Sequence, residues 1–573
     1  MTHTQARTPD YSRLTALILL GLLALRLAAV LLSPLELYAD EAQYWRWGQS
    51  LDWGYYSKPP LIAWLIHTST AIFGDTAWAV RLPAAFLHTA AAWCLFLLGR
   101  RVAGPRTGFL AAVGYALMPA VWLSSAVLST DGVLMPLWSV SLYLLWRVRE
   151  GDAGWAGFLG LGLAVGAGFL AKYAMIYFAI GLVLVAVFDK QTRRGLLSAQ
   201  GGAALALALA VITPHLVWNA LNDFATVGHT VDNANLGGHL FNPENVLKFL
   251  ADQMGVFGPV SFLGLLAALF FLRASRRPET GQQELWLSAF IVPVLAIILF
   301  QSVLSRAHAN WAATAYPAAS VLIAIFFLRA RPNRWLWAVI AVLSAVGFLI
   351  APDFTLLARL LAGLAVAAGI GLFALAFRFR PEGLFWAGLT LHGVLGLIMT
   401  AALIAPTALS GPLDLDNALK RTRGWDPLAD QLVAFTRQNG TPSALLTDER
   451  EVWHGLDFYL KDRIDAPLIL WRYNEGPHSF AEERPLTGDI DGDVLVASYR
   501  PNRRPAIAAD FATFERVGAI SVDLGERANG CPIVRELMLY RASGYAPLAR
   551  TDAWVERFDD QTMNAPEPCP PQD

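Results

Sequence analysis

Apolar runs of about 20 residues recur along the first 410 residues of the chain, separated by short polar segments. An α-helix crosses the ~30 Å hydrocarbon core of a bilayer in about 20 residues. The pattern therefore predicts a polytopic α-helical membrane protein. About 13 transmembrane helices are expected, at residues 14–34, 77–99, 107–128, 132–148, 156–171, 173–188, 200–218, 253–272, 286–304, 310–328, 335–351, 355–377 and 384–406.

The first apolar run has an alternative interpretation as a signal peptide. Arg7 and Arg13 precede it, and Ala39 stands near the place where cleavage would occur. The run, residues 15–34, is however longer than a typical signal core, and it contains Arg26. We therefore expect it to be retained as the first transmembrane helix.

The loops between the expected spans alternate between rich and poor in cations. The positive-inside rule places the cation-rich loops in the cytoplasm, together with the N-terminus. An odd number of spans then places the chain after about residue 407 outside. The few cations of the other loops lie near the membrane on the disfavoured side, where ionisable groups tend to be paired or functional. The cation-rich set is Arg100, Arg101, Arg106, Arg147, Arg149, Lys190, Arg193, Arg194, Arg273, Arg276, Arg277, Arg329, Arg331, Arg334, Arg378 and Arg380; the other set is Arg46, Lys58, Arg81, Lys172, Lys248 and Arg306.

The chain changes character after the last expected span. Residues 412–573 are charged, contain turn signals such as Asn439-Gly440, and mix short β-like runs with helical ones. We therefore expect a transmembrane domain over residues 1–411, followed by a small C-terminal α/β domain. The first external loop, at 35–76, is expected to contain helices that lie in the membrane interface, at about 41–50 and 60–73.

Two of the three cysteines, Cys531 and Cys569, lie in the C-terminal region. In an oxidising compartment they would form a disulfide. Two free thiols are the alternative, because sequence alone does not show which cysteines pair.

Composition supports a membrane protein and narrows the classes of function. Hydrophobic residues make up 55% of the 573 residues and charged residues only 16%, whereas soluble proteins carry about 25% charged residues. The net charge of −1 gives no reason to expect bulk binding of nucleic acid. The Walker A, GxGxxG and HExxH motifs do not occur, so chemistry driven by ATP or NAD is not expected.

The first external loop carries the first candidate chemistry. Asp40 and Glu41 follow the outer end of the first span, and Lys58 follows the aromatics Tyr55 and Tyr56, which are candidates for binding substrate. A carboxylate acts as a general base when it is held near a hydroxyl, and a lysine neutralises a phosphate. The alternative is an acidic pair that begins a helix lying in the membrane interface, where acids favour the helix N-terminus.

Three further loops on the same expected side add candidate residues. Asp131 stands at the mouth between the third and fourth spans, and Lys172 lies between two short spans. Arg306, His308 and Trp311 stand at the outer end of the ninth span, where Arg306 and His308 would contact an anionic group and His308 and Trp311 are candidates for binding substrate. Each has an ordinary alternative: a helix cap for the aspartate, a snorkelling lysine, and solvated loop residues. Their shared side is the main reason to predict an external active site.

Histidines raise the question of a metal. His215, and a loop with His229, Asp232 and His239, offer ligands, but their spacing matches no compact zinc pattern. We therefore do not expect a metal site. His215 is a weak candidate ligand, and dependence on a divalent metal stays open.

These motifs, in this order, resemble those of the bacterial branch of the protein O-mannosyltransferase superfamily. The matching elements are Asp40-Glu41, the Ser-Lys-Pro-Pro-Leu segment at 57–61, the Thr-Asp ending at Asp131, and the His-Ala-Asn-Trp at 308–311. The superfamily includes the lipid A aminoarabinose transferase and rhizobial galacturonosyl transferases of lipid A and core.

The resemblance covers about residues 10–410 and implies a GT-C fold with a polyprenyl-phosphate-linked sugar donor, used at the periplasmic face of the bacterial inner membrane. It implies that Asp40 is the catalytic aspartate, that Lys58 holds the donor phosphate, and that Asp131 is the second acidic position. The aminoarabinose transferase has a metal-binding glutamate at the position of Ser57. The serine weakens both the case for a metal site and the assignment of this chain to that enzyme.

The resulting hypothesis is an inverting transfer of a hexose or pentose to an envelope acceptor: lipid A, lipopolysaccharide core, another glycan or a protein. Lys58, with Arg306 or Lys172, would offset the charge that grows on the phosphate, and Asp40 would deprotonate the acceptor hydroxyl. The main alternative is a transporter or flippase for lipid-linked sugars, and a scaffold or polymerase subunit for envelope polysaccharide is a third interpretation. Transporters place ionisable groups near the bilayer midplane in related halves, and neither feature is evident here.

Overall fold

The computed structural model describes residues 9–234, 240–272, 278–330, 334–349, 356–413, 415–477, 479–487, 490, 492–527 and 530–558. The chain divides into two compact units, and each is described by itself. The first, here the helical unit, comprises Met1–Ser33 and Asp52–Ile404. The second, here the α/β unit, comprises Pro34–Leu51 and Ala405–Asp573, so part of the first external loop belongs to it.

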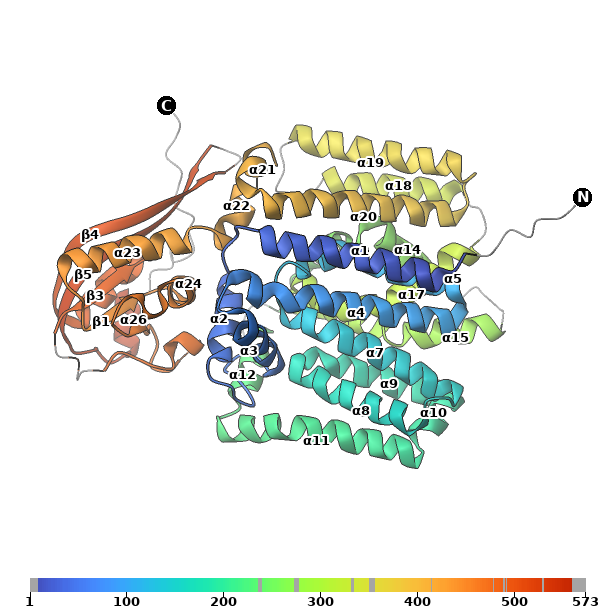
Figure 1. Cartoon of the computed structure of the whole chain (residues 1–573), viewed down its shortest axis with the longest axis horizontal. Helices are drawn as coiled ribbons and strands as arrows, with labels where there is room; N and C mark the ends of the chain where they lie inside the picture. The colour runs from blue at the N-terminus through green and yellow to red at the C-terminus, as the bar shows by residue number, and fades with distance from the viewer. Residues whose placement is uncertain are drawn as a thin grey trace, which may run out of the picture. The chain divides into compact units, whose positions relative to one another are not determined.

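The helical unit is a bundle in which α1, α4, α7, α8 and α11 lie side by side in a row (Figure 1). Its helices are α1 (Tyr11–Leu32), α3 (Leu61–Phe73), α4 (Ala77–Ala103), α5 (Pro105–Ala116), α6 (Pro119–Ser124), α7 (Thr130–Glu150), α8 (Gly154–Ala171), η1 (Tyr173–Met175), α9 (Ile176–Phe188), α10 (Lys190–Leu196), α11 (Ala199–Leu221), α12 (Ala225–Asn233), α13 (Glu244–Phe257), α14 (Pro259–Leu272), α15 (Pro278–Ser288), α16 (Val292–Leu304), η2 (Ala309–Ala315), α17 (Tyr316–Arg329), α18 (Arg334–Leu349), α19 (Leu356–Ala376) and α20 (Pro381–Ile404).

Membrane-spanning helices are confirmed, but the number of 13 is not. Within the described residues, seven helices are long and apolar enough to cross a membrane, or up to nine when two bent helix pairs each count as one span. The expected span at 107–128 is broken instead into α5 and α6. Pro119 begins α6, and proline cannot continue a preceding helix without losing a backbone hydrogen bond.

One of the bent pairs shows why a run of apolar residues is not always one straight helix. α13 and α14 meet at an angle of 112°. Gly258 lies between them with φ +89°, and a Cβ atom at this position would lie 1.8 Å from Nε2 of His392. Only glycine combines this backbone conformation with so close an approach. The expected straight span at 253–272 therefore consists of the last residues of α13, a bend at Gly258, and α14.

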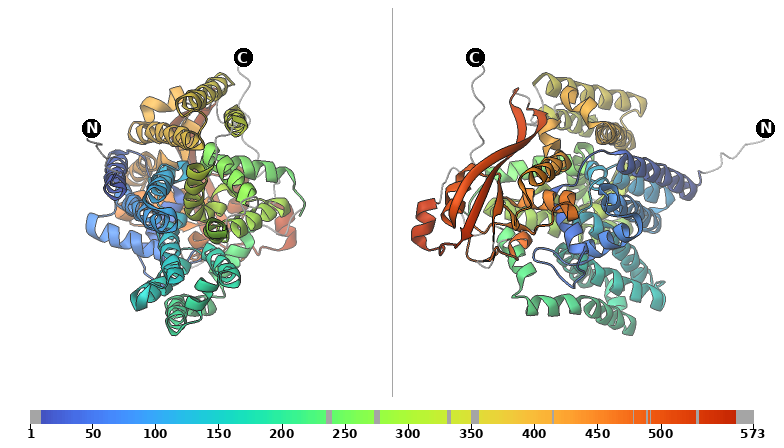
Figure 2. Two further views of the ribbon diagram at one scale, coloured as in Figure 1. Left: turned by 90° about the vertical axis from the view of Figure 1, so that its right-hand side faces the viewer. Right: turned by 60° about the vertical axis from the view of Figure 1, so that its left-hand side comes forward.

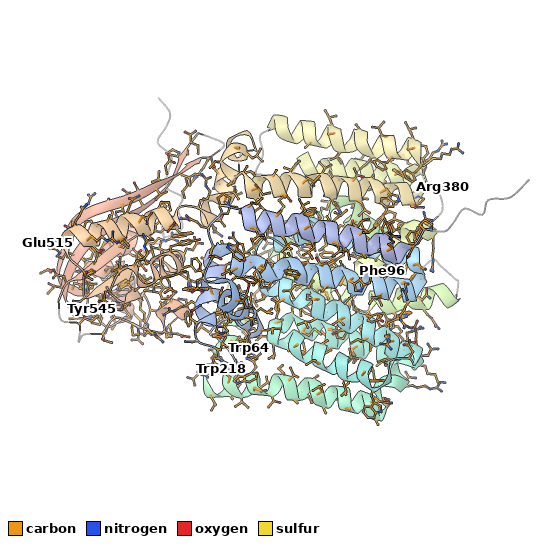
Figure 3. All side chains as sticks on the ribbon, in the orientation of Figure 1. Trp64, Phe96, Trp218, Arg380, Glu515 and Tyr545 are labelled. Atoms are coloured by element: carbon orange, nitrogen blue, oxygen red, sulfur yellow. The ribbon has the colours of Figure 1, made fainter. Side chains whose placement is uncertain are left out.

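Ion pairs at one end of the helical unit join loops that the sequence assigns to the same side. Figure 3 shows Arg380 at this end and the side chains of Trp64 and Trp218 at the other. The loops after α4, α7, α9 and α19 all contribute to these contacts, which agrees with the alternation of cation-rich and cation-poor loops. The pairs are Arg101–Glu150 (2.5 Å), Arg149–Asp189 (2.9 Å) and Arg106–Glu382.

The α/β unit is built on a five-stranded mixed sheet with the strand order β2-β1-β3-β5-β4. β1 pairs in parallel with β2 and β3, whereas β5 pairs antiparallel with β3 and β4. The long β4–β5 pair is seen in the right-hand view of Figure 2. The elements are α2 (Ala39–Gly48), α21 (Pro406–Leu413), α22 (Asp416–Leu419), η3 (Lys420–Thr422), α23 (Trp425–Asn439), β1 (Ala444–Thr447), α24 (Arg450–Leu460), η4 (Lys461–Arg463), β2 (Leu468–Leu470), η5 (Phe480–Glu482), β3 (Val494–Ser498), η6 (Pro501–Arg503), α25 (Arg504–Ala509), β4 (Phe511–Glu526), β5 (Pro532–Tyr545) and α26 (Asp552–Phe558).

The sheet has an apolar core on each face. Leu445 and Leu495 pack with α23 and α24 on one side, and Leu446 and Val494 pack with α25 and α26 on the other. This alternation follows from the two-residue period of side chains along a strand. Of the two cysteines expected to pair, Cys531 is buried and Cys569 lies outside the described residues, so their disulfide stays a prediction.

Candidate active site

Asp131, Lys172 and Asn310 meet at one end of the helical unit. Nζ of Lys172 lies 2.7 Å from Oδ1 of Asp131, and Nδ2 of Asn310 donates to Oδ2 at 2.7 Å. Asp131 is the second residue of α7, whose N-cap is Ser129, so the carboxylate also lies at the positive end of a helix. The structure therefore brings together two predicted residues, and it shows that the ammonium of Lys172 is paired.

The segment 305–311 places further predicted residues beside this cluster. The rings of His308 and Trp311 are 5.1 Å apart. Partial burial, and then the cations Arg306, Lys248 and Lys172, lower the pKa of His308, which favours the neutral imidazole. Arg306 is exposed to solvent. Lys172 is paired with Asp131 and Lys248 with Asp252 (2.9 Å), so the exposed Arg306 is the cation of this group best suited to an anionic substrate.

The chain returns to the helical unit at Asp52, and the segment that follows includes the predicted lysine. Lys58 is half-buried, and its carbonyl accepts a hydrogen bond from the Tyr55 N–H at 3.2 Å. Burial raises the pKa of Tyr55 to about 12, and its hydroxyl accepts from the Asp52 N–H at 3.1 Å. The ring of Tyr56 lies 5.9 Å from that of His229. Tyr55 is thus a buried support of the loop.

His215 fastens this loop to α11. Its Nδ1 lies 2.7 Å from the carbonyl oxygen of Trp53, and its Nε2 lies 2.7 Å from the hydroxyl of Tyr173. The carbonyl only accepts, so Nδ1 donates and Nε2 accepts from the tyrosine. Thr226 adds a second tie, because its hydroxyl donates to the Tyr55 carbonyl at 2.6 Å.

Both ring nitrogens of His215 are therefore occupied by hydrogen bonds, which gives this residue the role of an anchor in place of a metal ligand. Among the described residues, no three histidine, cysteine or acidic side chains gather as a metal site. His239 lies outside the described residues.

Adjacent residues join the cluster and the loop into one network. Lys172 binds Asp131, and the next residue, Tyr173, binds His215, which holds Trp53. Segments from four parts of the chain thus converge at one end of the helical unit, as Figure 3 shows for Trp64 and Trp218.

Asp40 and Glu41 lie in the α/β unit, at the start of α2, and have different environments. Glu41 is fully buried, and its Oε2 accepts from the Tyr38 N–H at 3.1 Å, which makes it a helix cap. Asp40 is 41% exposed, and its Oδ1 lies 2.6 Å from Nη2 of Arg450. The geometry of Glu41 matches the capping alternative, whereas the Asp40 side chain is partly exposed to solvent.

Asn310, Tyr173 and Arg450 have contacts that inspection of the sequence did not assign. Asn310 stands inside the His-Ala-Asn-Trp motif, and Tyr173 follows Lys172, so proximity to a motif was the available signal. Arg450 is 410 residues from Asp40 along the chain, and a single sequence holds no signal for this pairing.

Comparison with known proteins shows what this architecture is similar to. The profile of the dolichyl-phosphate-mannose-protein mannosyltransferase family matches residues 57–218, which include Lys58, Asp131 and Lys172. The lipid A galacturonosyltransferase RgtD of Rhizobium johnstonii is 31% identical over 487 residues, covering 84% of this chain and 89% of that protein. The undecaprenyl phosphate-alpha-4-amino-4-deoxy-L-arabinose arabinosyl transferase of Pseudomonas aeruginosa is 28% identical over 277 residues, covering 46% of this chain and 49% of that protein.

Among solved structures, ArnT from Cupriavidus metallidurans bound to undecaprenyl phosphate matches with a TM-score of 0.63 at 17% sequence identity, covering 93% of this chain and 98% of that one. This likeness shows the fold, and the likeness to RgtD along most of both chains shows the family. The chain therefore belongs to the GT-C glycosyltransferases, in the family of protein O-mannosyltransferase-like enzymes that includes RgtD.

Proposed function

We propose that this protein transfers a sugar, with inversion, from a polyprenyl-phosphate donor to an acceptor of the bacterial envelope. The observation that supports this most is the convergence of Asp131, Lys172 and the segment 305–311 at one end of the helical unit. Two relatives support the donor, because one is named for undecaprenyl phosphate and the other is bound to it in its solved structure.

The chemical step needs no redox partner. The oxygen of an acceptor hydroxyl forms a bond to the anomeric carbon, the bond from that carbon to the phosphate oxygen breaks, and polyprenyl phosphate leaves with the electron pair. Phosphate is a stable leaving group, so the protein mainly has to offset its negative charge. Lys58 and Arg306 are proposed for this role. Lys172 shares its charge with Asp131 and is proposed to fix the phosphate's position.

Asp40 is proposed to take the proton of the acceptor hydroxyl. A carboxylate serves as a general base when it is accessible and can be held within hydrogen-bond reach of the hydroxyl. Asp40 is accessible, and Glu41 is buried as a helix cap, so the base role falls on the first of the adjacent pair.

The cation-rich end of the helical unit is proposed to face the cytoplasm, and the Asp131 end the periplasm. The positive-inside rule supports this orientation, since the ion-paired arginines gather at one end. Lipid A is the acceptor that the relationship to RgtD favours, because that relative is named for it. Core oligosaccharide, other glycans and protein hydroxyls are the alternatives.

The test is an assay with the purified protein, a polyprenyl-phosphate sugar and lipid A, scored by mass spectrometry for free polyprenyl phosphate and glycosylated lipid A. We expect both products in equal amounts. A transporter would instead move the intact donor across a vesicle membrane without releasing polyprenyl phosphate, and that result would replace the transferase proposal.

A further inference from the structure

The helix that carries Asp40 is held along its length by the α/β unit. α2 and α24 run in the same direction, because Asp40 contacts Arg450 near their starts and Arg46 contacts Asp457 (3.7 Å) further along. α2 has ten residues and would not be stable alone, since isolated helices shorter than about 12 residues are marginal in water. Its conformation therefore depends on its packing against α24.

Aromatic contacts fix the side of α2 that faces α24. The rings of Trp45 and Phe458 meet edge to face at 4.8 Å, and Nζ of Lys461 lies 5.6 Å from the Trp45 ring. Trp47 is fully buried and its ring lies 6.0 Å from that of Phe480. Aromatic pairs with this geometry add about 0.5–1.5 kcal/mol each to the burial of their surface. These contacts hold the helix without any contribution from Asp40.

The chain just before α2 is also fixed. The Glu36 carboxylate accepts from the Asp426 N–H at 3.2 Å, and the Leu37 N–H donates to the Tyr459 hydroxyl at 2.8 Å. The Glu36 N–H donates to the Thr422 carbonyl at 2.8 Å. The position of α2 is therefore determined by backbone and apolar contacts and does not depend on the Asp40 side chain.

These contacts do not fix the orientation of two polar side chains of α2, and Arg450 binds both of them. Its Nη2 donates to Oδ1 of Asp40 at 2.6 Å and also to Oε1 of Gln43, one helical turn further on. A charge-assisted bond of this kind is stronger and more directional than a neutral one. Oδ2 of Asp40 makes no hydrogen bond to a residue that the structure describes. One carboxylate oxygen is thus fixed while the other stays available.

We propose that Arg450 is a positioning residue for glycosyl transfer: it holds the Asp40 carboxylate in the orientation in which its second oxygen takes the acceptor's proton. The C-terminal part of the α/β unit, Ala405–Asp573, then takes part in the chemical step through Arg450. The inference rests on the proposed function and adds to it a residue that binds neither donor nor acceptor.

The first test is steady-state kinetics of the full-length Arg450→Gln and Arg450→Lys variants. We expect Arg450→Gln to lower kcat by roughly 10- to 100-fold with the KM for the donor unchanged, because small misplacements of a catalytic group cost about this much. Arg450→Lys restores part of kcat, since it keeps the charge but not the two-fold contact.

Arg463→Gln is the matched control. Arg463 lies in the same unit, is exposed to a similar degree (37% against 38%), and also forms ion pairs, with Asp426 and Asp430. It is expected to keep the kcat of the unaltered protein. An unchanged kcat in Arg450→Gln, or an equal loss in Arg463→Gln, would overturn the positioning role while leaving the transferase itself standing.

A second measurement does not depend on activity. The backbone of α2 is held by contacts that Arg450 does not make, so hydrogen exchange of peptides covering 39–48 is expected to keep the rate of the unaltered protein in Arg450→Gln. Clearly faster exchange there would show that Arg450 supports the helix as a whole, and would overturn its role as a residue that orients the Asp40 side chain. Failure of the unaltered protein to release polyprenyl phosphate would count against the proposed function alone.

Discussion

Nζ of Lys172 lies 2.7 Å from Oδ1 of Asp131, although 41 positions separate the two residues along the chain. Asp131 lies in the first turn of α7, and Lys172 directly follows the end of α8. Both side chains are largely buried. Removing one partner of such a pair leaves an uncompensated charge, which costs more stability than removing both. The pair therefore allows a structural role to be separated from a catalytic one.

For this pair we expect Asp131→Asn and Lys172→Gln each to lower the melting temperature of the purified protein and to lower turnover by about 100-fold. The double variant should regain most of the melting temperature but none of the turnover. A double variant with the turnover of the unaltered protein would make the pair purely structural.

Gly54 allows the first-loop segment to pack against α11. A Cβ atom at this position would lie 2.3 Å from the ring of Trp218. Gly54→Ala is therefore expected to displace the loop and to raise the KM for the donor several-fold, because Lys58 follows in the same segment. Gly21→Ala on α1, where a Cβ atom meets nothing within 4 Å, is the control and should leave the KM unchanged.

His215 supports the same segment from within α11. His215→Ala removes the partner of the Trp53 carbonyl, whereas the Tyr173 hydroxyl keeps its contact with Nδ2 of Asn219 (3.3 Å). A polar group that loses its partner inside a protein costs about 1–3 kcal/mol. We expect a lower melting temperature and a raised KM for the donor, with kcat less affected. A fall in kcat alone, at constant KM, would show that His215 acts on the reaction and not on the loop.

Asp457 predicts a pH dependence of stability. Burial raises the pKa of Asp457 from its usual 3.8 to about 6, and Arg46 offsets this only in part. The folded state therefore holds this proton more tightly than the unfolded state. The stabilising contribution is complete below about pH 4 and is lost as the pH rises through about 6.

The Asp457→Asn variant keeps the shape of the side chain without the charge. At pH 7 it should be more stable than the unaltered protein by up to roughly 3 kcal/mol, the free energy that corresponds to this change in pKa. Its melting temperature should depend less on pH between 4 and 7. Asp426→Asn, at a well-exposed carboxylate, is the control. Identical pH profiles for the unaltered and Asp457→Asn proteins would contradict this account.

Much of the helical unit follows from local sequence. Apolar runs predict its helices, and the alternation of cation-rich loops corresponds to the ion pairs at one end, such as Arg149 with Asp189. The presence of Asp131 and Lys172 in one cluster agrees with their expected shared side. The number of spans was not predictable, because the conformation of Gly258 and its contact with His392 determine where an apolar run bends.

Long-range pairings of side chains could not be predicted from the sequence either. Asp40 stands in a loop that hydropathy assigns to the transmembrane domain, yet its helix packs with the α/β unit through Arg450. His215 offers a possible metal ligand by residue type, and only the positions of Trp53 and Tyr173 show that its nitrogens are used. A sequence gives the chemical type of a side chain but not the partner that the fold brings to it.

The most direct test is to measure donor binding and polyprenyl phosphate release in one preparation of the Asp40→Asn variant. The account predicts that the variant binds a polyprenyl-phosphate sugar with the affinity of the unaltered protein and releases no polyprenyl phosphate above the uncatalysed rate, because the acceptor proton has no base to receive it. Release at the normal rate would contradict it.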